Sequence, residues 1–368
     1  MKPVLLVLNV GSSSLKFALY DVVDKDKPDL LLRGSKLAIG GPAALLSVLA
    51  EVDTAGEIVA IGHRVVHGGA EFIAPTVITP EILERLRRLI PLAPLHEPQS
   101  LEVIGQIAAL RPALPQVACF DTAFHSGHAP TVDRLPLPRA WAEARGLRRY
   151  GFHGIAYEYL AARLAELDPA LISGRVVMAH LGAGASLCAV RAGRSIDTTM
   201  GFSTLDGLIM ATRCGALDPG VVLHLIQWEG MDAEAVQDLL YRQSGLLGLS
   251  GFSGDMRELL ASNRPEAAQA IEGYVLQIVR QIGALTAVMG GLDGLVFSGG
   301  VGEHAAEVRA LVCDRLGWLG FELDPDANDR HAPLISTAAS LPVRIIPADE
   351  EQVIVRRTLA ACALGRGT

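Results

Sequence analysis

The stretch Val4-Leu5-Leu6-Val7-Leu8-Asn9-Val10-Gly11-Ser12-Ser13-Ser14-Leu15-Lys16-Phe17-Ala18-Leu19-Tyr20 decides the fold at the start of the chain. Two apolar runs flank a short turn of glycine and serine, which predicts a β-hairpin. A turn of this composition offers backbone N–H groups and hydroxyls to an anion, and Lys16 adds a positive charge. It is not a Walker loop, because no Gly-Lys-Ser/Thr sequence opens a helix. The stretch therefore predicts a phosphate-binding hairpin.

The same pattern recurs far downstream. The apolar runs Val176–Leu181 and Ser186–Val190 flank Gly182-Ala183-Gly184-Ala185, and a second turn leads into Ser195–Thr199. A third Gly-rich turn is expected at 299–302, after a strand over Leu292–Ser298. A chain of 368 residues is longer than one hydrophobic core usually accommodates, so two domains are expected. The internal repeat indicates that these domains are similar.

Strand-like and helix-like segments alternate along the rest of the chain, which indicates an α/β fold. Further strands are expected at Gln116–Phe120 and Val343–Pro347. Phe120–Ala123 is a candidate hinge. Helical spacing of apolar residues is found at Pro80–Ile90, Tyr157–Leu167, Ala233–Arg242, Ala267–Met289, Ala305–Leu316 and Glu350–Ala363.

Composition narrows the class of protein. The net charge of −8 and the absence of a long basic stripe argue against a nucleic-acid partner. The five cysteines lack Cys-x-x-Cys spacing and are expected to be reduced, buried thiols. Asn9 interrupts the first apolar run, so no signal peptide is expected, and no apolar run reaches the ~18–20 residues that span a bilayer. A cytoplasmic protein without a membrane partner is expected.

Two charged residues are placed at strand ends. Arg64 precedes Val65 and Val66 at the end of a predicted buried strand, where a guanidinium can bind a carboxylate or phosphate; a structural salt bridge is the alternative. Asp121 follows the strand Gln116–Phe120, at the end of a sheet where ligands bind; a helix N-cap is the alternative. His63 and His67 are expected to be structural rather than metal ligands.

Other isolated polar residues accompany the glycines. His153 lies between glycines, His180 leads into the second turn, Arg213 precedes Cys214-Gly215, and Asp255 and Arg257 follow Gly254. Positive donors and an acid that could bind a metal are what phosphoryl transfer requires.

The chain resembles the acetate kinase family, part of the acetate and sugar kinase/Hsp70/actin superfamily. The segments 9–16 and 63–69 resemble two highly specific family signatures, and the resemblance covers nearly the whole chain. Other motifs in family order are Leu95-His96, Phe120–His125, Tyr150–Gly154, His180–Gly182 and Asp349–Glu351. The resemblance implies two actin-like (ribonuclease H-like) α/β domains with an interdomain cleft. The N-terminal domain would span 1–121, with 353–368 packing back onto it, and the nucleotide-binding domain 122–352.

The resemblance also implies site residues. Asn9 and Glu350 would hold Mg²⁺, or Mn²⁺. Asp121, His153 and Arg213 would be catalytic. Arg64 would be catalytic too, holding the substrate carboxylate beside an acyl pocket lined by Val66, Leu95 and Phe152. The nucleotide and its phosphates would contact Ser12, Ser14, Lys16, His180, Leu181, Gly182, Ala183, Gly184, Asp255, Met256, Arg257, Gly300, Val301, Gly302, Glu303 and His304.

The implied activity is that of a homodimeric acetate kinase, which forms acetyl phosphate and ADP reversibly from acetate and ATP. A propionate- or butyrate-type kinase is an alternative, as is a nucleotide-binding family member without transferase activity. A sugar kinase of the superfamily would need a carboxylate base for a hydroxyl substrate, whereas here an arginine is expected to face the substrate.

Four positions depart from the family pattern. Ala183 replaces the usual asparagine, Thr204 a proline, Met256 a phenylalanine and His304 an asparagine. The charged catalytic positions are intact, so the reaction class is retained. The departures bear on which acid and which nucleotide are preferred, because one lost neutral hydrogen bond costs roughly 0.5–1.5 kcal/mol.

Overall fold

The computed structural model describes residues 1–11, 14–37 and 43–364. Contacts divide the chain into two compact units. Unit 1 contains Met1–Ser126, Gly154–Tyr159 and the chain from Asp349 on, and unit 2 contains Gly127–His153 and Leu160–Ala348. The domain limits expected from the sequence stay a prediction. No helix in the described ranges combines the length and apolar character that crossing a membrane requires.

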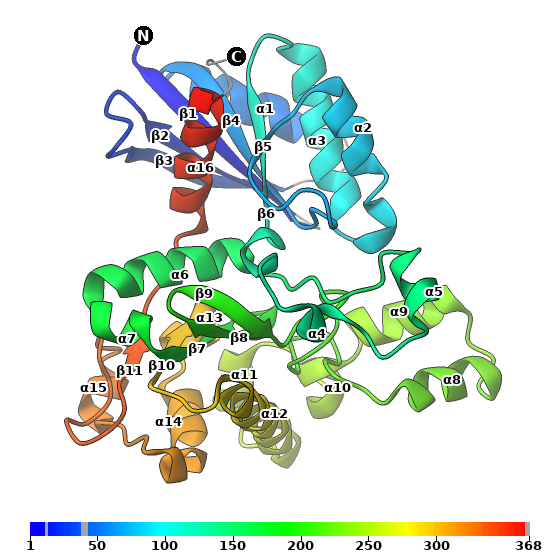
Figure 1. Ribbon diagram of the computed structural model, residues 1–368, viewed down its shortest axis with the longest axis vertical. Coiled ribbons are helices and arrows are strands. Elements are labelled where there is room, and N and C mark those ends of the chain that lie inside the picture. The colour runs from blue at the N-terminus through cyan, green and yellow to red at the C-terminus, as the bar shows by residue number, and fades with distance from the viewer. Residues whose placement is uncertain (12–13, 38–42, 365–368) are drawn as a thin grey trace. The chain divides into compact units, whose positions relative to one another are not determined.

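The sheet of unit 1 has the strand order β3-β2-β1-β4-β6-β5 (Figure 1). The predicted hairpin is confirmed as the antiparallel pair β1 and β2, and β3 pairs with β2. Strands β4 and β6 run parallel to β1, and β5 pairs antiparallel with β6. The strands are β1 Pro3–Val10, β2 Ser14–Asp21, β3 Asp29–Leu37, β4 Glu57–Val65, β5 Thr76–Val77 and β6 Gln116–Phe120.

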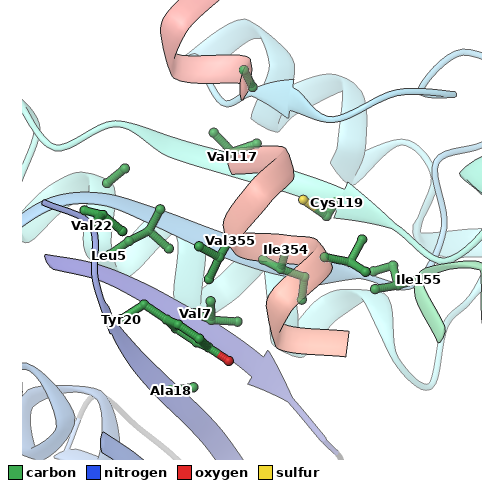
Figure 2. Packing of buried hydrophobic residues seen from close by; sticks show 13 residues of the cluster. Leu5, Val7, Ala18, Tyr20, Val22, Val117, Cys119, Ile155, Ile354 and Val355 are labelled. Atoms are coloured by element: carbon green, nitrogen blue, oxygen red, sulfur yellow. The ribbon is translucent and has the colours of Figure 1, made fainter. Parts of the chain in front are cut away.

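Helices cover both faces of this sheet, which explains why β1 is a continuous apolar run. Its odd residues Leu5 and Val7 pack with Ile354 and Val355 of α16 (Glu350–Leu364) in one cluster, as Figure 2 shows. Its even residues pack on the other side against α1 (Ala43–Asp53), in a cluster that includes Leu45. Because successive side chains of a strand point to opposite faces, one run of apolar residues serves both layers.

The sheet of unit 2 has the order β11-β10-β7-β8-β9. Strands β7, β8 and β9 form an antiparallel meander, and β10 and β11 extend it in parallel. This repeats the arrangement of β1, β2, β3, β4 and β6 in unit 1, so the predicted internal repeat is confirmed. The strands are β7 Arg175–Leu181, β8 Ala185–Arg191, β9 Arg194–Thr198, β10 Gly294–Ser298 and β11 Val343–Ile345.

The core of unit 2 depends on the long helix α12 (Pro265–Met289), which packs against β7, β8 and β9. Ile278 and Ile282 on this helix are fully buried, as expected for a central helix.

The remaining α-helices of the two units are α2 Pro80–Arg87, α3 Glu97–Leu110, α4 Pro130–Asp133, α5 Arg139–Glu143, α6 Gly154–Leu167, α7 Pro169–Ser173, α8 Pro219–Gln227, α9 Ala233–Arg242, α10 Gly245–Ser250, α11 Met256–Leu260, α13 Gly299–His304, α14 Ala306–Arg315 and α15 Pro325–Asp329. Short 3-10 helices are found at Ile90–Leu92, Ala123–His125 and Gly317–Leu319.

Candidate active site

The carboxyl ends of β4 and β6 bring Arg64 and Asp121 together. In the parallel register Arg64 is level with Cys119, so Asp121 lies just beyond the strand end. Nε of Arg64 donates to both carboxylate oxygens at 3.1 Å, and Nη2 donates to Oδ2 at 2.7 Å. Asp121 is only 2% exposed, so the structure holds a buried, bidentate ion pair.

The remaining amino group of Arg64 faces a second carboxylate. Nη1 lies 3.6 Å from Oε2 of Glu350, at the start of α16. Burial disfavours the charge, but the carboxylates of Asp121 and Glu350 raise the pKa of Arg64 above its ordinary value. The guanidinium is thus a permanent cation at the strand ends, and it combines the salt bridge considered for it with a position suited to binding.

The proposed metal ligands lie around the same arginine. Leu8 of β1 is level with His63 of β4, so Asn9 is level with Arg64, and Glu350 approaches Arg64 directly. One carboxylate and one amide oxygen suit Mg²⁺, which keeps several waters and takes its other ligands from phosphates. Across the described ranges, no group of three or more His, Cys, Asp or Glu side chains is arranged to hold a metal. The donor set fits a metal shared with a nucleotide.

The hairpin turn carries the predicted phosphate contacts of unit 1. Asn9 pairs with Lys16 in the β1–β2 register, and the amide of Gly11 donates to the carbonyl of Ser14 at 2.8 Å. Lys16 is exposed. Ser12 lies outside the described residues, so its predicted contact stays a prediction, together with those of Ser14 and Lys16.

Two of the predicted acyl-pocket residues belong to unit 1. Val66 directly follows β4, and Leu95 lies two residues before Glu97, whose Oε2 accepts a hydrogen bond from the amide of His67 at 3.3 Å. Val66 and Leu95 are both half-buried. Phe152 belongs to unit 2 and is 1% exposed. The pocket itself stays a prediction.

The two histidines flanking Arg64 are structural, as predicted. The ring of His63 is buried, and its Nε2 lies 2.8 Å from Oε1 of Gln116. Nδ1 of His67 accepts a hydrogen bond from the amide of Gly69 at 2.8 Å. Burial lowers the pKa of each imidazole to about 4, so both rings are neutral at physiological pH.

In unit 2 the second turn lies beside the predicted catalytic residues His153 and Arg213. A Cβ at position 184 would lie 3.4 Å from Nε2 of His153 and 3.6 Å from Nη2 of Arg213. The ring centroids of His153 and His180 are 5.0 Å apart, and Nδ1 of His153 lies 2.9 Å from Oγ of Ser186. His153 adopts a left-handed backbone with φ of 58°. Such strain in a residue other than glycine clusters at functional sites.

Arg213 is held by the backbone of Thr204, one of the four positions that differ from the family pattern. Its Nη1 donates to the carbonyl of Thr204 at 2.9 Å. The carbonyl of Ala183 likewise accepts from the amide of Ala211 at 3.1 Å. Both interactions use main-chain oxygens, so the side chains at positions 183 and 204 are not needed for them.

The segment with Asp255 and Arg257 adjoins this cluster. A side chain at position 254 would lie 2.6 Å from the carbonyl of Ala211. Asp255 caps α11, and its hydrogen bond from Arg257 lowers its pKa to about 2. Met256 is buried, whereas the side chain of Arg257 is 91% exposed. Their predicted nucleotide contacts stay predictions.

The third Gly-rich segment is not a turn, and this part of the sequence prediction is wrong. Gly299–Gly302 form the first residues of helix α13, which packs against β7. Oε1 of Glu303 accepts from the amide of Gly299 at 2.8 Å, so the helix caps its own start. The side chain of His304 is 72% exposed. The predicted nucleotide contacts of Gly300, Val301, Gly302, Glu303 and His304 stay predictions.

Sequence reasoning missed the residue that holds α13 in place. Arg309 on α14 is fully buried, and its Nη1 donates to the carbonyls of Gly302 at 2.9 Å and Glu303 at 3.0 Å. Nε and Nη2 donate to the side chain and the carbonyl of Asn328, both at 2.8 Å. A lone arginine in a helix is usually a surface residue, so no signal in the sequence identified Arg309.

Comparisons with known proteins identify the family of the chain. The sequence model of the Acetokinase family matches residues 38–356. The chain is 47% identical to an acetate kinase of Rhodopseudomonas palustris over 399 aligned residues, which cover 100% of both sequences. It is 46% identical to an acetate kinase of Rhizobium meliloti, with 97% of this chain and 98% of the relative aligned.

Solved structures give the same result. An acetate kinase of Porphyromonas gingivalis matches with a TM-score of 0.88 at 35% identity, covering 98% of this chain and 100% of that chain. A propionate kinase of Francisella tularensis matches with a TM-score of 0.88 at 34% identity, covering 97% of this chain and 99% of that one. The two sheets thus form the actin-like α/β fold expected from the sequence, and the chain belongs to the acetokinase family.

Proposed function

We propose that this chain is an ATP-dependent acetate kinase, which transfers the γ-phosphoryl group of ATP reversibly to acetate and forms acetyl phosphate and ADP. The observation that carries the choice of a carboxylate acceptor is Arg64. Asp121 binds Nε and Nη2, and Nη1 lies 3.6 Å from Glu350; the side chain is 23% exposed, so we propose that Nη1 also reaches the acceptor anion. Similarity to acetate kinases along the whole length supports the proposal.

The acceptor needs no general base. A short carboxylic acid is already ionised at pH 7, so its oxygen can attack phosphorus directly. The new bond joins that oxygen to the γ-phosphorus, and the bond to the bridging β,γ-oxygen breaks with its electron pair leaving on ADP. Arg64 offsets the repulsion between the two anions, and Asp121 holds the guanidinium in place rather than accepting a proton.

Residues of unit 2 are proposed to stabilise the transferred group. His153 and Arg213 lie beside Gly184, and transition-state charge spreads over the phosphoryl oxygens. Preorganised cationic and N–H donors at such a position lower the barrier. The interdomain cleft, in which the residues of both units would act on one phosphoryl group, stays a prediction.

A magnesium ion is part of the proposal, with manganese as a substitute. Asn9 and Glu350 would hold it, because Asn9 is level with Arg64 in the strand register, Glu350 lies 3.6 Å from Arg64, and oxygen donors suit a hard cation. When bound, the ion neutralises charge on the nucleotide phosphates. A cytoplasmic location is also proposed, since ATP and ADP are the co-substrates and Cys119, Cys188 and Cys313 are buried thiols.

A panel of acids tests the function. Acetate, propionate and butyrate are each supplied with ATP or GTP, and the acyl phosphate is trapped with hydroxylamine. We expect ATP with acetate to give the highest kcat/KM, because one extra methylene changes discrimination by about 10–200-fold in a pocket shaped for one chain length. A reaction without acid measures background ATP hydrolysis.

Other outcomes select the alternatives. A preference for propionate or butyrate would assign a longer-chain kinase, for which the similar propionate kinase fold is the specific support. Tight ATP binding without acyl phosphate from any acid would contradict kinase activity and favour a nucleotide-binding protein.

The homodimer that the family resemblance implies is proposed to form through α8. Its residues Pro219–Gln227 include none that is buried. Leu223 is 54% exposed and Trp228, directly after the helix, is 79% exposed. Neighbouring exposed apolar residues of this kind mark protein interfaces.

Light scattering after gel filtration tests this proposal. Wild type should elute with twice the chain mass of 38.9 kDa, and the double variant Leu223→Asp/Trp228→Asp should elute with the mass of one chain. Val23→Asp, at an apolar residue of unit 1 that is 68% exposed, is the control and should keep the wild-type mass. A monomeric wild type, or an unchanged mass for the double variant, would contradict the proposal.

A further inference from the structure

A buried carboxyl lies next to the acceptor side of the site and is not used by the mechanism above. Glu97, the first residue of α3, has no exposed surface. Its Oε2 accepts a hydrogen bond from the amide of His67 at 3.3 Å. Among the described residues, no hydrogen-bond donor reaches its Oε1. Buried carboxyl groups are rarely left half-satisfied, so this one calls for an explanation.

The segment that Glu97 holds matters to the site. Val66 and His67 directly follow β4, whose penultimate residue is Arg64. The amide of the next residue, Gly68, donates to Oγ1 of Thr122, one residue beyond Asp121, at 3.1 Å. The carboxyl of Glu97 and the hydroxyl of Thr122 therefore fix the consecutive residues His67 and Gly68, shortly after Arg64.

We propose that Glu97 is a positioning residue for the acceptor acid: its buried carboxyl holds the backbone after Arg64 and so places Val66 against the acyl chain. The proposal rests on the proposed function, in which Arg64 and Val66 face that acid. It adds a residue and a protonation state that the proposed function does not contain.

The surroundings of Glu97 favour the uncharged form. Its pKa is raised to about 8, mainly by burial and also by the nearby Asp121 carboxylate, whereas hydrogen bonds from the amides of His67 and Val66 oppose the rise. The ring of His67 is neutral, so it supplies no compensating charge. On α3 itself His96 precedes Glu97, and from α2 the guanidinium of Arg87 lies against Gly105, further along α3.

Ionisation of Glu97 would act against substrate binding. A second negative charge beside Asp121 repels an acceptor that is itself an anion. The KM for acetate should therefore rise as the pH increases through about 8. The acid itself stays ionised over about pH 6.5–9.5, so its own titration does not produce this change.

Two substitutions separate the proposed effects. Glu97→Gln keeps an oxygen acceptor without the titration, and it should keep the neutral-pH KM for acetate within about twofold while losing the alkaline rise. Glu97→Ala removes the acceptor, and it should raise that KM about tenfold at every pH, with the KM for ATP almost unchanged. Glu102→Ala, on the exposed part of the same helix, is the matched control and should behave as wild type.

Thermal unfolding provides a readout independent of activity. The folded state binds the Glu97 proton more tightly than the unfolded state, whose carboxyl has the ordinary pKa of 4.5. Stability should therefore fall as the pH rises from about 4.5 to about 8 and then level off. Glu97→Gln should remove this part of the slope and melt at a higher temperature than wild type at pH 9.

The outcomes are distinguishable. A wild-type acetate KM for folded Glu97→Ala, or an alkaline rise that persists in Glu97→Gln, would overturn the proposal while leaving the kinase function intact. A wild type that phosphorylates no acid would overturn the proposed function and this inference together. If Glu97→Ala does not fold, the pH profiles of wild type and Glu97→Gln still decide.

Discussion

Replacing Arg64 by alanine is expected to lower kcat/KM for acetate by about 10²–10³-fold, because one preorganised donor to reacting charge is worth that much. The same change removes the guanidinium that compensates the charge of Asp121, whose side chain is 2% exposed. An uncompensated buried charge costs about 3–5 kcal/mol, so the free energy of unfolding should fall by that amount. Steady-state kinetics and urea unfolding measure the two effects.

Two further variants separate binding from folding. Arg64→Lys keeps the positive charge but cannot donate in a bidentate fork, so it should lose activity with a smaller loss of stability. The double variant Arg64→Met/Asp121→Leu removes both charges, and it should recover stability but not activity. An unchanged KM and kcat in Arg64→Ala would remove Arg64 from the site.

Replacing Arg213 by alanine is expected to lower kcat by about 10²–10³-fold and to change the KM for ATP by much less. The guanidinium lies beside Gly184 and is held by the carbonyl of Thr204 at 2.9 Å, which suits a group that acts on developing charge. An interaction made mainly in the transition state appears in kcat rather than in KM. Initial rates at varied ATP and saturating acetate measure both.

An exposed arginine of the same unit provides the control for this experiment. Arg194 is at the start of β9 on the surface, and Arg194→Ala should leave kcat and both KM values unchanged. A rise in the KM for ATP with wild-type kcat in Arg213→Ala would instead make Arg213 a nucleotide-binding residue. A wild-type kcat and KM in Arg213→Ala would show that Arg213 does not stabilise the transferred phosphoryl group.

Local patterns were sufficient to predict the elements that carry the site. The period of apolar residues and the glycine-serine turn predicted the hairpin, and the strand β6 was predicted with its observed bounds. Arg64 and Asp121 were each placed at a strand end. Their pairing was not predictable, because β4 and β6 become neighbours through contacts between residues far apart in the sequence. Whether Arg64 bound a ligand or formed a salt bridge therefore stayed open.

Burial explains the residues that were missed. An acid at the first position of a helix is ordinary, since it interacts favourably with the helix dipole, so Glu97 carried no signal. Arg309 carried no signal either, because arginine side chains are rarely fully buried. Position along a helix is a local property, whereas complete burial depends on which elements pack over a side chain. The segment 299–302 was predicted as a turn because glycines favour turns, but Glu303 caps it as a helix.

By itself, the sequence determined the two apolar hairpins with their glycine-rich turns, because strand periodicity and turn chemistry are local. The repeat of the hairpin indicated two similar sheets in an α/β fold. Family motifs added the class of reaction. Only the tertiary structure decided that Asp121 is the buried partner of Arg64 and that Glu97 is enclosed behind Val66 and His67. Charge states and hydrogen-bond partners depend on desolvation and on neighbours from distant segments, and neither is encoded in a short stretch of residues.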